Sequence, residues 1–229
     1  MIRGVKTLKS SVLLLIALIL GSQQANPPLG PTIAQLLIEK GLAKINDIQR
    51  NKIRADLHSS DEDKGQLEEG DGIITGRPRL VENLSVKELY DAFGSRFEFY
   101  IDDPKSTQEI NGKIYGVIKF RPKTGLNIRK TADQFINRVS GNVYMDLDTF
   151  FIARVDGSVE NPFSFRFKYW FIPLTTVHVH RFEFSVEYTM FNNIAVEKKL
   201  SGSADFDHTY RSRGMRKSTY TLDNYRMIS

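Results

Sequence analysis

The sequence predicts an α+β fold in which a strongly curved antiparallel sheet forms an incomplete barrel, with one or two helices packed in its mouth. Three observations lead to this fold class. Residues 175–190 alternate between two sets of side chains, one apolar from Phe182 onward and one polar, which is typical of an antiparallel strand with one buried face. Helical stretches come first and a run of strands follows, as in α+β folds. A long sheet also curls, and an aromatic inner face then needs a helix, a protein or an apolar ligand to fill it.

The first 25 residues predict a secretory signal peptide. Arg3, Lys6 and Lys9 precede an apolar run at 12–20, and this run is too short to span a bilayer comfortably. We therefore expect export to the periplasm or cell envelope, with an uncleaved membrane anchor as the alternative. Residues 26–31 (NPPLGP) predict a stiff spacer, and a single domain is expected over 32–229.

Composition narrows the classes of partner. The chain has 229 residues, with 32 Lys and Arg against 27 Asp and Glu. Removing the three basic residues of the leader leaves 32 − 3 = 29 basic residues against 27 acidic ones, so the net charge falls from +5 to +2. Such a balance does not indicate nucleic acid as a partner. The chain has no cysteine, so the exported domain must be held together by its core and not by disulfides.

The N-terminal part predicts two helices separated by a loop. Apolar residues recur at helical spacing over 32–57, with Gly41 as a weak point. Residues 58–72 are acidic and nearly devoid of apolar side chains, which favours a mobile loop. A second helix is expected from Ser85, with Glu88 completing a capping box and Gly94 ending the helix.

From residue 96 onward the periodicity changes to that of strands. Asn111-Gly112 and Asn192-Asn193 predict tight turns, and a short helix is expected within 128–139. The expected strands are 96–101, 113–121, two segments within 141–160 bent at Asp146–Asp148, 163–172, 175–190, 194–205 and 217–228, with a basic turn at 211–217.

The order of these elements resembles that of a known family. The segments that carry the resemblance are Asn111-Gly112, the strand ending FRPK at 120–123, Asn137 and Arg138, the Gly-x-Val-Tyr-x-Asp strand at 141–146, and Asp223, Tyr225 and Arg226. With these features the chain is similar to bacterial exported proteins related to the outer-membrane lipoprotein-sorting (LolA/LolB-like) family. The resemblance implies a curved, incomplete barrel whose apolar interior takes acyl chains. The chain departs from the family at 194–197 (IAVE), where members often carry a tryptophan-proline pair.

One set of apolar side chains is the candidate ligand site. It lies on inward-facing positions of the expected strands, where it can line a lipid cavity or form an ordinary sealed core, and the sequence leaves both open. The set is Phe97, Phe99, Ile118, Phe120, Phe182, Phe184, Val186 and Tyr188.

Two further groups of polar residues are candidate sites. His178 and His180 form an H-x-H pair that is expected to lie on the same strand face as Phe182, but two imidazoles are a weak metal signal, so we expect no metal and no cofactor. Asp146 and Asp148 are more typical of a turn than of an acid–base pair.

A cluster of basic side chains could meet anionic headgroups or an acidic partner, although a solvated turn is the favoured interpretation. These side chains are Arg211, Arg213, Arg216 and Lys217. The sequence contains no thiol nucleophile, no nucleophile elbow and no phosphate-binding loop, so we expect no enzymatic activity.

Two functions from different classes fit these observations. The first is a non-enzymatic periplasmic carrier for an acyl chain or a lipoprotein, acting as a monomer. The second is an envelope protein–protein interaction or sensor module with a sealed core, which would use the sheet edges and the acidic segment at 58–72.

Overall fold

The computed structural model describes residues 32–45, 52–61, 66–73, 79–81, 84–169, 172–209 and 211–228. Within it, Ile33–Ser229 forms one compact unit. The predicted signal peptide (1–25) and spacer (26–31) lie outside the described residues. None of the described helices combines the length and the apolar character needed to cross a membrane.

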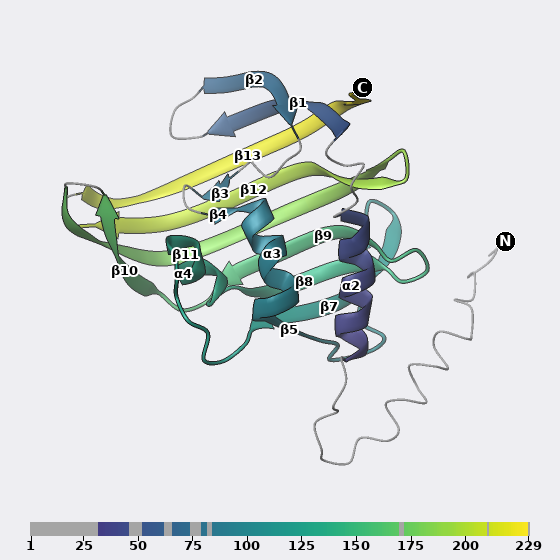
Figure 1. The fold of residues 1–229 in the computed structure, drawn as a ribbon, viewed down its shortest axis with the longest axis horizontal. Coiled ribbons are helices and arrows are strands. Elements are labelled where there is room, and N and C mark those ends of the chain that lie inside the picture. The colour runs from purple at the N-terminus through teal and green to yellow at the C-terminus, as the bar shows by residue number, and fades with distance from the viewer. Residues whose placement is uncertain are drawn as a thin grey trace, which may run out of the picture. The chain divides into compact units, whose positions relative to one another are not determined.

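The fold is built around one antiparallel sheet of 11 strands that does not close into a barrel (Figure 1). The strand order is β2-β1-β13-β12-β11-β9-β8-β7-β5, with β10 paired to β11 and β6 paired to β7. The predicted fold class is therefore confirmed. The strands are β1 (Ile53–Asp61), β2 (Gln66–Ile73), β5 (Phe97–Tyr100), β6 (Thr107–Ile110), β7 (Lys113–Pro122), β8 (Ser140–Asp146), β9 (Phe151–Val159), β10 (Phe163–Tyr169), β11 (Ile172–Phe191), β12 (Ile194–His208) and β13 (Arg211–Met227). A separate small pair consists of β3 (Arg79–Val81) and β4 (Leu84–Ser85).

The described residues contain three helices, and all three lie across one face of the sheet (Figure 1). They are α2 (Ile33–Ile45), α3 (Val86–Arg96) and α4 (Thr131–Ile136). In α2 the buried side chains recur at helical spacing, so one stripe of the helix packs against the sheet. Gly41 belongs to this contact, because an added Cβ would lie 2.8 Å from the side chains of Ile152 and Met145.

The two faces of the sheet differ in polarity. In β9, Ile152, Val155 and Val159 are buried toward the helices, and Arg154 and Asp156 lie on the other face. The core therefore lies between the sheet and the helices, and we call the helix-covered face the inner face. The opposite, outer face carries most of the polar side chains, as expected for an antiparallel sheet with one wet side.

The predicted tight turns are confirmed. Asn111 and Gly112 have φ angles of 51° and 77°, and Asn192 and Asn193 have φ angles of 49° and 63°. Positive φ at both central residues is the backbone geometry of the two-residue hairpin turns that asparagine and glycine favour. These turns set the register of β6 with β7 and of β11 with β12.

The acidic loop predicted at 58–72 is wrong, because these residues belong largely to a β-hairpin. β1 pairs with β2 from Arg54↔Ile73 to Asp61↔Gln66, and the outer edge of β13 holds β1 in place. Leu57 pairs with Leu222 there and packs against the core. Backbone pairing to a distant strand thus outweighs an acidic composition that favours a loop, as tertiary context often does for strands.

Three other boundaries also differ from the sequence prediction. The first helix ends at Ile45 rather than continuing to 57, since Ile53 already belongs to β1. Gly94 lies inside α3, which continues to Arg96, where the guanidinium is held by acceptors near α4. The basic turn predicted at 211–217 is the beginning of β13, which pairs with β12 up to Arg211.

A β-bulge in β11 overturns the prediction that His178 and His180 share a face with Phe182. Val179 pairs with Phe206 of β12 and Arg181 pairs with Asp205, so His180 is an extra residue on β11. The inserted residue reverses the alternation. Before the bulge the odd-numbered Val179 is buried, and after it the even-numbered Phe182 is buried.

Candidate functional site

All eight residues of the candidate apolar site lie in the core against the inner face of the sheet, and each is at most 5 % exposed. β5 and β7 contribute the first four, with Phe99 directly opposite Phe120. β11 contributes the other four by strict alternation after its bulge. The structure brings all of them into one hydrophobic cluster.

The ring of Phe93, on α3, fills the centre of this cluster. Its centroid lies 5.4 Å from that of Phe97, 5.5 Å from that of Phe99 and 5.2 Å from that of Phe120. One turn earlier on the same helix, Tyr90 lies 6.0 Å from Tyr188. These distances are typical of favourable aromatic pairs. Phe93 is not among the eight residues predicted for the site, although it follows Leu89 and Tyr90 by four and three residues, which is the spacing of one helix face.

Phe135, on α4, occupies the other half of the interior in the same way. Its ring centroid lies 5.2 Å from that of Phe182, and 5.4 and 5.8 Å from those of Phe163 and Phe165 in β10. In the described conformation the aromatic interior is therefore occupied by side chains of α3 and α4.

One polar group in this interior has no partner. The hydroxyl of Tyr188 is buried and makes no hydrogen bond within the described part of the chain. The whole residue is only 5 % exposed, and its position on β11 lies directly opposite Glu197 of β12. Leaving a buried hydroxyl without a partner costs about 1–3 kcal/mol. Tyr188 therefore offers an unused hydrogen-bond donor at a place where the aromatic cluster meets the buried Glu197 side chain.

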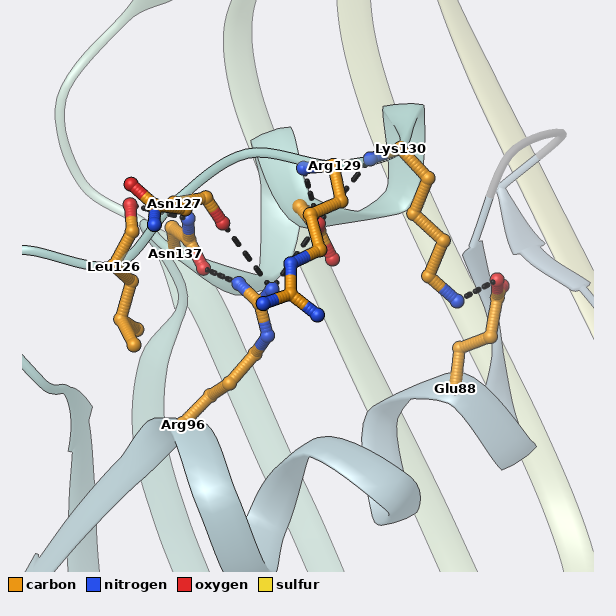
Figure 2. A network of polar contacts seen from close by, with 8 residues as sticks. Glu88, Arg96, Leu126, Asn127, Arg129, Lys130 and Asn137 are labelled. Atoms are coloured by element: carbon orange, nitrogen blue, oxygen red, sulfur yellow. Dashed lines mark hydrogen bonds and ion pairs between the residues drawn. The ribbon is translucent and has the colours of Figure 1, made fainter.

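The C-terminal end of α3 is held by a partly buried polar network (Figure 2). The Arg96 guanidinium donates to Asn137 Oδ1 at 2.6 Å, to Asp133 Oδ2 at 3.1 Å and to the carbonyl oxygen of Asn127 at 3.2 Å. Asp133 is only 2 % exposed and also accepts the backbone N–H of Arg129 at 2.7 Å. Because the Asp133 carboxylate is buried, loss of Arg96 would leave it without its charged partner, which makes this contact costly to break.

The N-terminal end of α3 is held more weakly. Lys130 donates to Glu88 across a gap of 2.7 Å, and the two side chains are 56 % and 30 % exposed (Figure 2). Ion pairs this exposed contribute about 0–1 kcal/mol. The ion pair between Glu88 and Lys130 is therefore more exposed to solvent than the contact between Arg96 and Asp133.

The two histidines interact with different partners. His178 Nδ1 lies 2.6 Å from Ser164 Oγ, and His180 Nε2 lies 2.7 Å from Asp207 Oδ2. Ser164 and Asp207 contact two different imidazole rings, so they do not form a Ser-His-Asp catalytic triad. No group of three or more potential metal ligands occurs among the described residues.

Asp146 organises the turn after β8. Its Oδ1 accepts the backbone N–H groups of Asp148 and Thr149 at 3.0 and 3.2 Å, and Lys113 donates to Oδ2 at 2.5 Å. Burial pushes the pKa of Asp146 upward, but the hydrogen bonds from Lys113 and Thr149 outweigh it and hold the pKa below its usual value. These contacts explain Asp146 as part of a turn.

The predicted basic cluster is spread along β13. Arg213 pairs with Asp205 on the neighbouring strand β12, and Lys217 lies further along on the outer face. The side chains of Arg211 and Arg216 lie outside the described part of the structure.

Comparison with known proteins found no relative, since no family model, no curated protein and no solved structure matches the chain.

Proposed function

We propose that this chain is a non-enzymatic periplasmic carrier that takes an acyl chain, free or attached to a lipoprotein, into the aromatic interior beneath α3. The observation that carries the proposal is the buried Tyr188 hydroxyl, which has no partner within the described residues. A fatty acyl ester or carboxyl group entering this interior would accept that hydrogen bond, and its hydrocarbon would contact the surrounding rings.

The difference in solvent exposure between the two ion pairs of α3 supports this proposal. Displacing the helix about its Arg96 end requires loss of the exposed Glu88–Lys130 contact, while the buried Arg96–Asp133 pair stays intact. Such a motion separates Tyr90 from Tyr188 and loosens the packing of Phe93 on the rings around it, which makes room for an acyl chain next to the Tyr188 hydroxyl. Burial of the acyl chain supplies about 0.8 kcal/mol per CH₂ group, which offsets the lost ring contacts.

Two features of the sequence agree with a carrier of this kind. Residues 1–25 have the pattern of a secretory signal peptide, and the element order from 97 to 227 resembles the lipoprotein-sorting family. We therefore place the protein in the periplasm, with an acyl lipid or a lipoprotein as its partner. We also propose that it acts as a monomer.

Native mass spectrometry tests the proposal. The full chain is expressed with its leader, purified gently from the cell envelope and measured before and after incubation with phospholipid vesicles. Extra mass equal to a phospholipid or an acylated peptide supports the carrier. A bare polypeptide mass that stays unchanged after incubation refutes it. The same spectrum reports whether residues 1–25 have been removed.

A second candidate function is an envelope protein–protein interaction or sensor module with a sealed core. The close ring contacts of Phe93 and Phe135 favour it, since they fill the interior as the described structure stands. Under this hypothesis partners would pair with free sheet edges such as that of β2, whose sequence is acidic. A bound polypeptide in the native spectrum, without lipid, would favour this function over the carrier.

A further inference from the structure

The outer face of the sheet, opposite the helices, contains a hollow of about 470 Å³. This volume lies within the range of small-molecule sites. The lining residues come from β8, β9, β11, β12 and β13, which are consecutive in the sheet. The hollow is separate from the interior proposed to hold an acyl chain, because the sheet itself lies between them.

A row of glycines crosses the sheet beneath the hollow. Gly141 of β8 pairs with Gly157 of β9, which pairs with Phe184 of β11, which in turn pairs with Gly202 of β12. The ring of Phe184 covers Gly157 on the inner face so closely that an added Cβ would lie 2.4 Å from Phe184 Cε1. The outer side of this row is bordered by side chains one position away on each strand.

Those bordering side chains are polar, and most of them are short. One row across the sheet is Asn142, Asp156, Ser185, Ser201 and Thr219, and the next is Ser158, Glu183, Ser203 and Lys217. Five of these residues carry hydroxyls, and the Ser185 hydroxyl has no hydrogen-bond partner within the described residues. These hydroxyls belong to Ser158, Ser185, Ser201, Ser203 and Thr219. Each hydroxyl can both donate and accept, so the hollow presents hydrogen-bonding groups on several strands.

The charges around the hollow cancel. Arg154 and Lys217 carry positive charge, and Asp156 and Glu183 carry negative charge. Arg154 Nε donates to Asp156 Oδ1 at 2.7 Å, which fixes one carboxylate at the rim, and Arg181 donates to Glu183 at 3.1 Å. A ligand of either sign would meet a like charge as well as an opposite one, so the lining favours a neutral ligand.

We propose that this outer hollow binds a neutral polyhydroxylated ligand, namely a saccharide unit. A sugar ring carries several hydroxyls that both donate and accept, which matches the serine and threonine hydroxyls across the two rows. The carboxylates of Asp156 and Glu183 accept hydrogen bonds from neighbouring sugar hydroxyls, and Arg154 donates to ring or hydroxyl oxygens. The small side chains leave the floor open to the edge of the sugar.

The experiment is a titration of the ¹⁵N-labelled full chain with chitobiose and with maltose, followed by amide chemical shifts. Saturable shifts confined to the strands around Ser201, Ser185 and Thr219 are expected. Ser201→Leu fills the hollow without touching the core and should weaken binding at least about tenfold. Thr221→Leu lies on the same outer face of β13 but outside the hollow, and should bind as the unchanged chain does.

A second variant keeps the test decisive if Ser201→Leu disturbs folding. Glu183→Gln keeps the shape of the side chain and removes the charge, so it should weaken binding of the neutral sugars several-fold and favour glucuronate over maltose. The proposal is overturned if neither neutral sugar gives saturable shifts, if the shifts spread over the surface without saturating, or if glucuronate or glucosamine binds the unchanged chain more tightly than maltose does. It is also overturned if a folded Ser201→Leu chain binds maltose as tightly as the unchanged chain.

Discussion

Replacing Tyr188 with phenylalanine should raise the stability of the protein and lower its affinity for an acyl ligand. The Tyr188 hydroxyl is buried without a partner among the described residues, and such a group costs about 1–3 kcal/mol in the folded state. Removing the hydroxyl while keeping the ring should therefore raise the free energy of unfolding by about 1 kcal/mol. The ligand loses one hydrogen bond of about 0.5–1.5 kcal/mol, which corresponds to roughly 2- to 12-fold weaker binding.

Two assays measure the expected rise in stability and the expected fall in affinity. Urea denaturation gives the change in unfolding free energy, and displacement of a fluorescent fatty acid gives the change in affinity. Tyr225→Phe is the matched control, because Tyr225 already donates to the carbonyl oxygens of Glu197 at 2.5 Å and Leu222 at 2.9 Å. The control should lose about 1 kcal/mol of stability and bind the fatty acid normally. Unchanged fatty-acid affinity in Tyr188→Phe would refute the role given to this hydroxyl.

Three further predictions follow from the packing and the charges. Phe93→Ala should lower the unfolding free energy by about 3–5 kcal/mol in urea denaturation while increasing uptake of a fluorescent fatty acid, and a fall in uptake would contradict the proposed site. Gly157→Ala places a Cβ 2.4 Å from the Phe184 ring and should lower the unfolding free energy by about 1–3 kcal/mol. Adding Phe184→Leu should restore part of this stability, and a double variant no more stable than Gly157→Ala in urea denaturation would contradict the contact. The pKa of Asp146 is below its usual 3.8, since hydrogen bonds from Lys113 and Thr149 outweigh burial, so its stabilisation is lost as the pH falls below about 4. In thermal melts the Asp146→Asn variant should lose less stability than the unchanged chain between about pH 5 and pH 2. An equal loss of stability in both chains would show that another group is responsible.

Much of the fold could be predicted because its signals are local. The alternation of 175–190 and the turns at Asn111-Gly112 and Asn192-Asn193 depend on residues next to each other in the chain, and the structure places β11 and both hairpins there. Local backbone geometry and side-chain period decide such elements.

The sequence predictions differ from the structure where segments that are far apart in the sequence pair with each other. Nothing around His180 marks a bulge, since neither glycine nor proline is adjacent, and the extra residue becomes visible only from the pairing of β11 with β12. The hairpin of β1 and β2 is hidden by its acidic composition and is held through β13, which lies at the other end of the chain.

The candidate site was also only partly predictable. Alternation along β11 identified Tyr188 and Phe184 as inward-facing, and both are buried. The missing partner of the Tyr188 hydroxyl and the plugging of the interior by Phe93 depend on how α3 lies on the sheet, which no local pattern specifies. The outer hollow depends in the same way on short polar side chains from separate strands falling into neighbouring rows.

A covalent crosslink that holds α3 in place tests the proposed carrier function most directly. The chain contains no cysteine, so Glu88→Cys and Lys130→Cys can be joined by a short bifunctional maleimide without competing reactions. The crosslink replaces the weak contact between those side chains with a covalent one. The carrier function predicts that the crosslinked chain no longer takes up a fluorescent fatty acid, and that the same double variant without the crosslinker takes it up normally. Equal uptake by the locked and unlocked chains would contradict entry beneath α3.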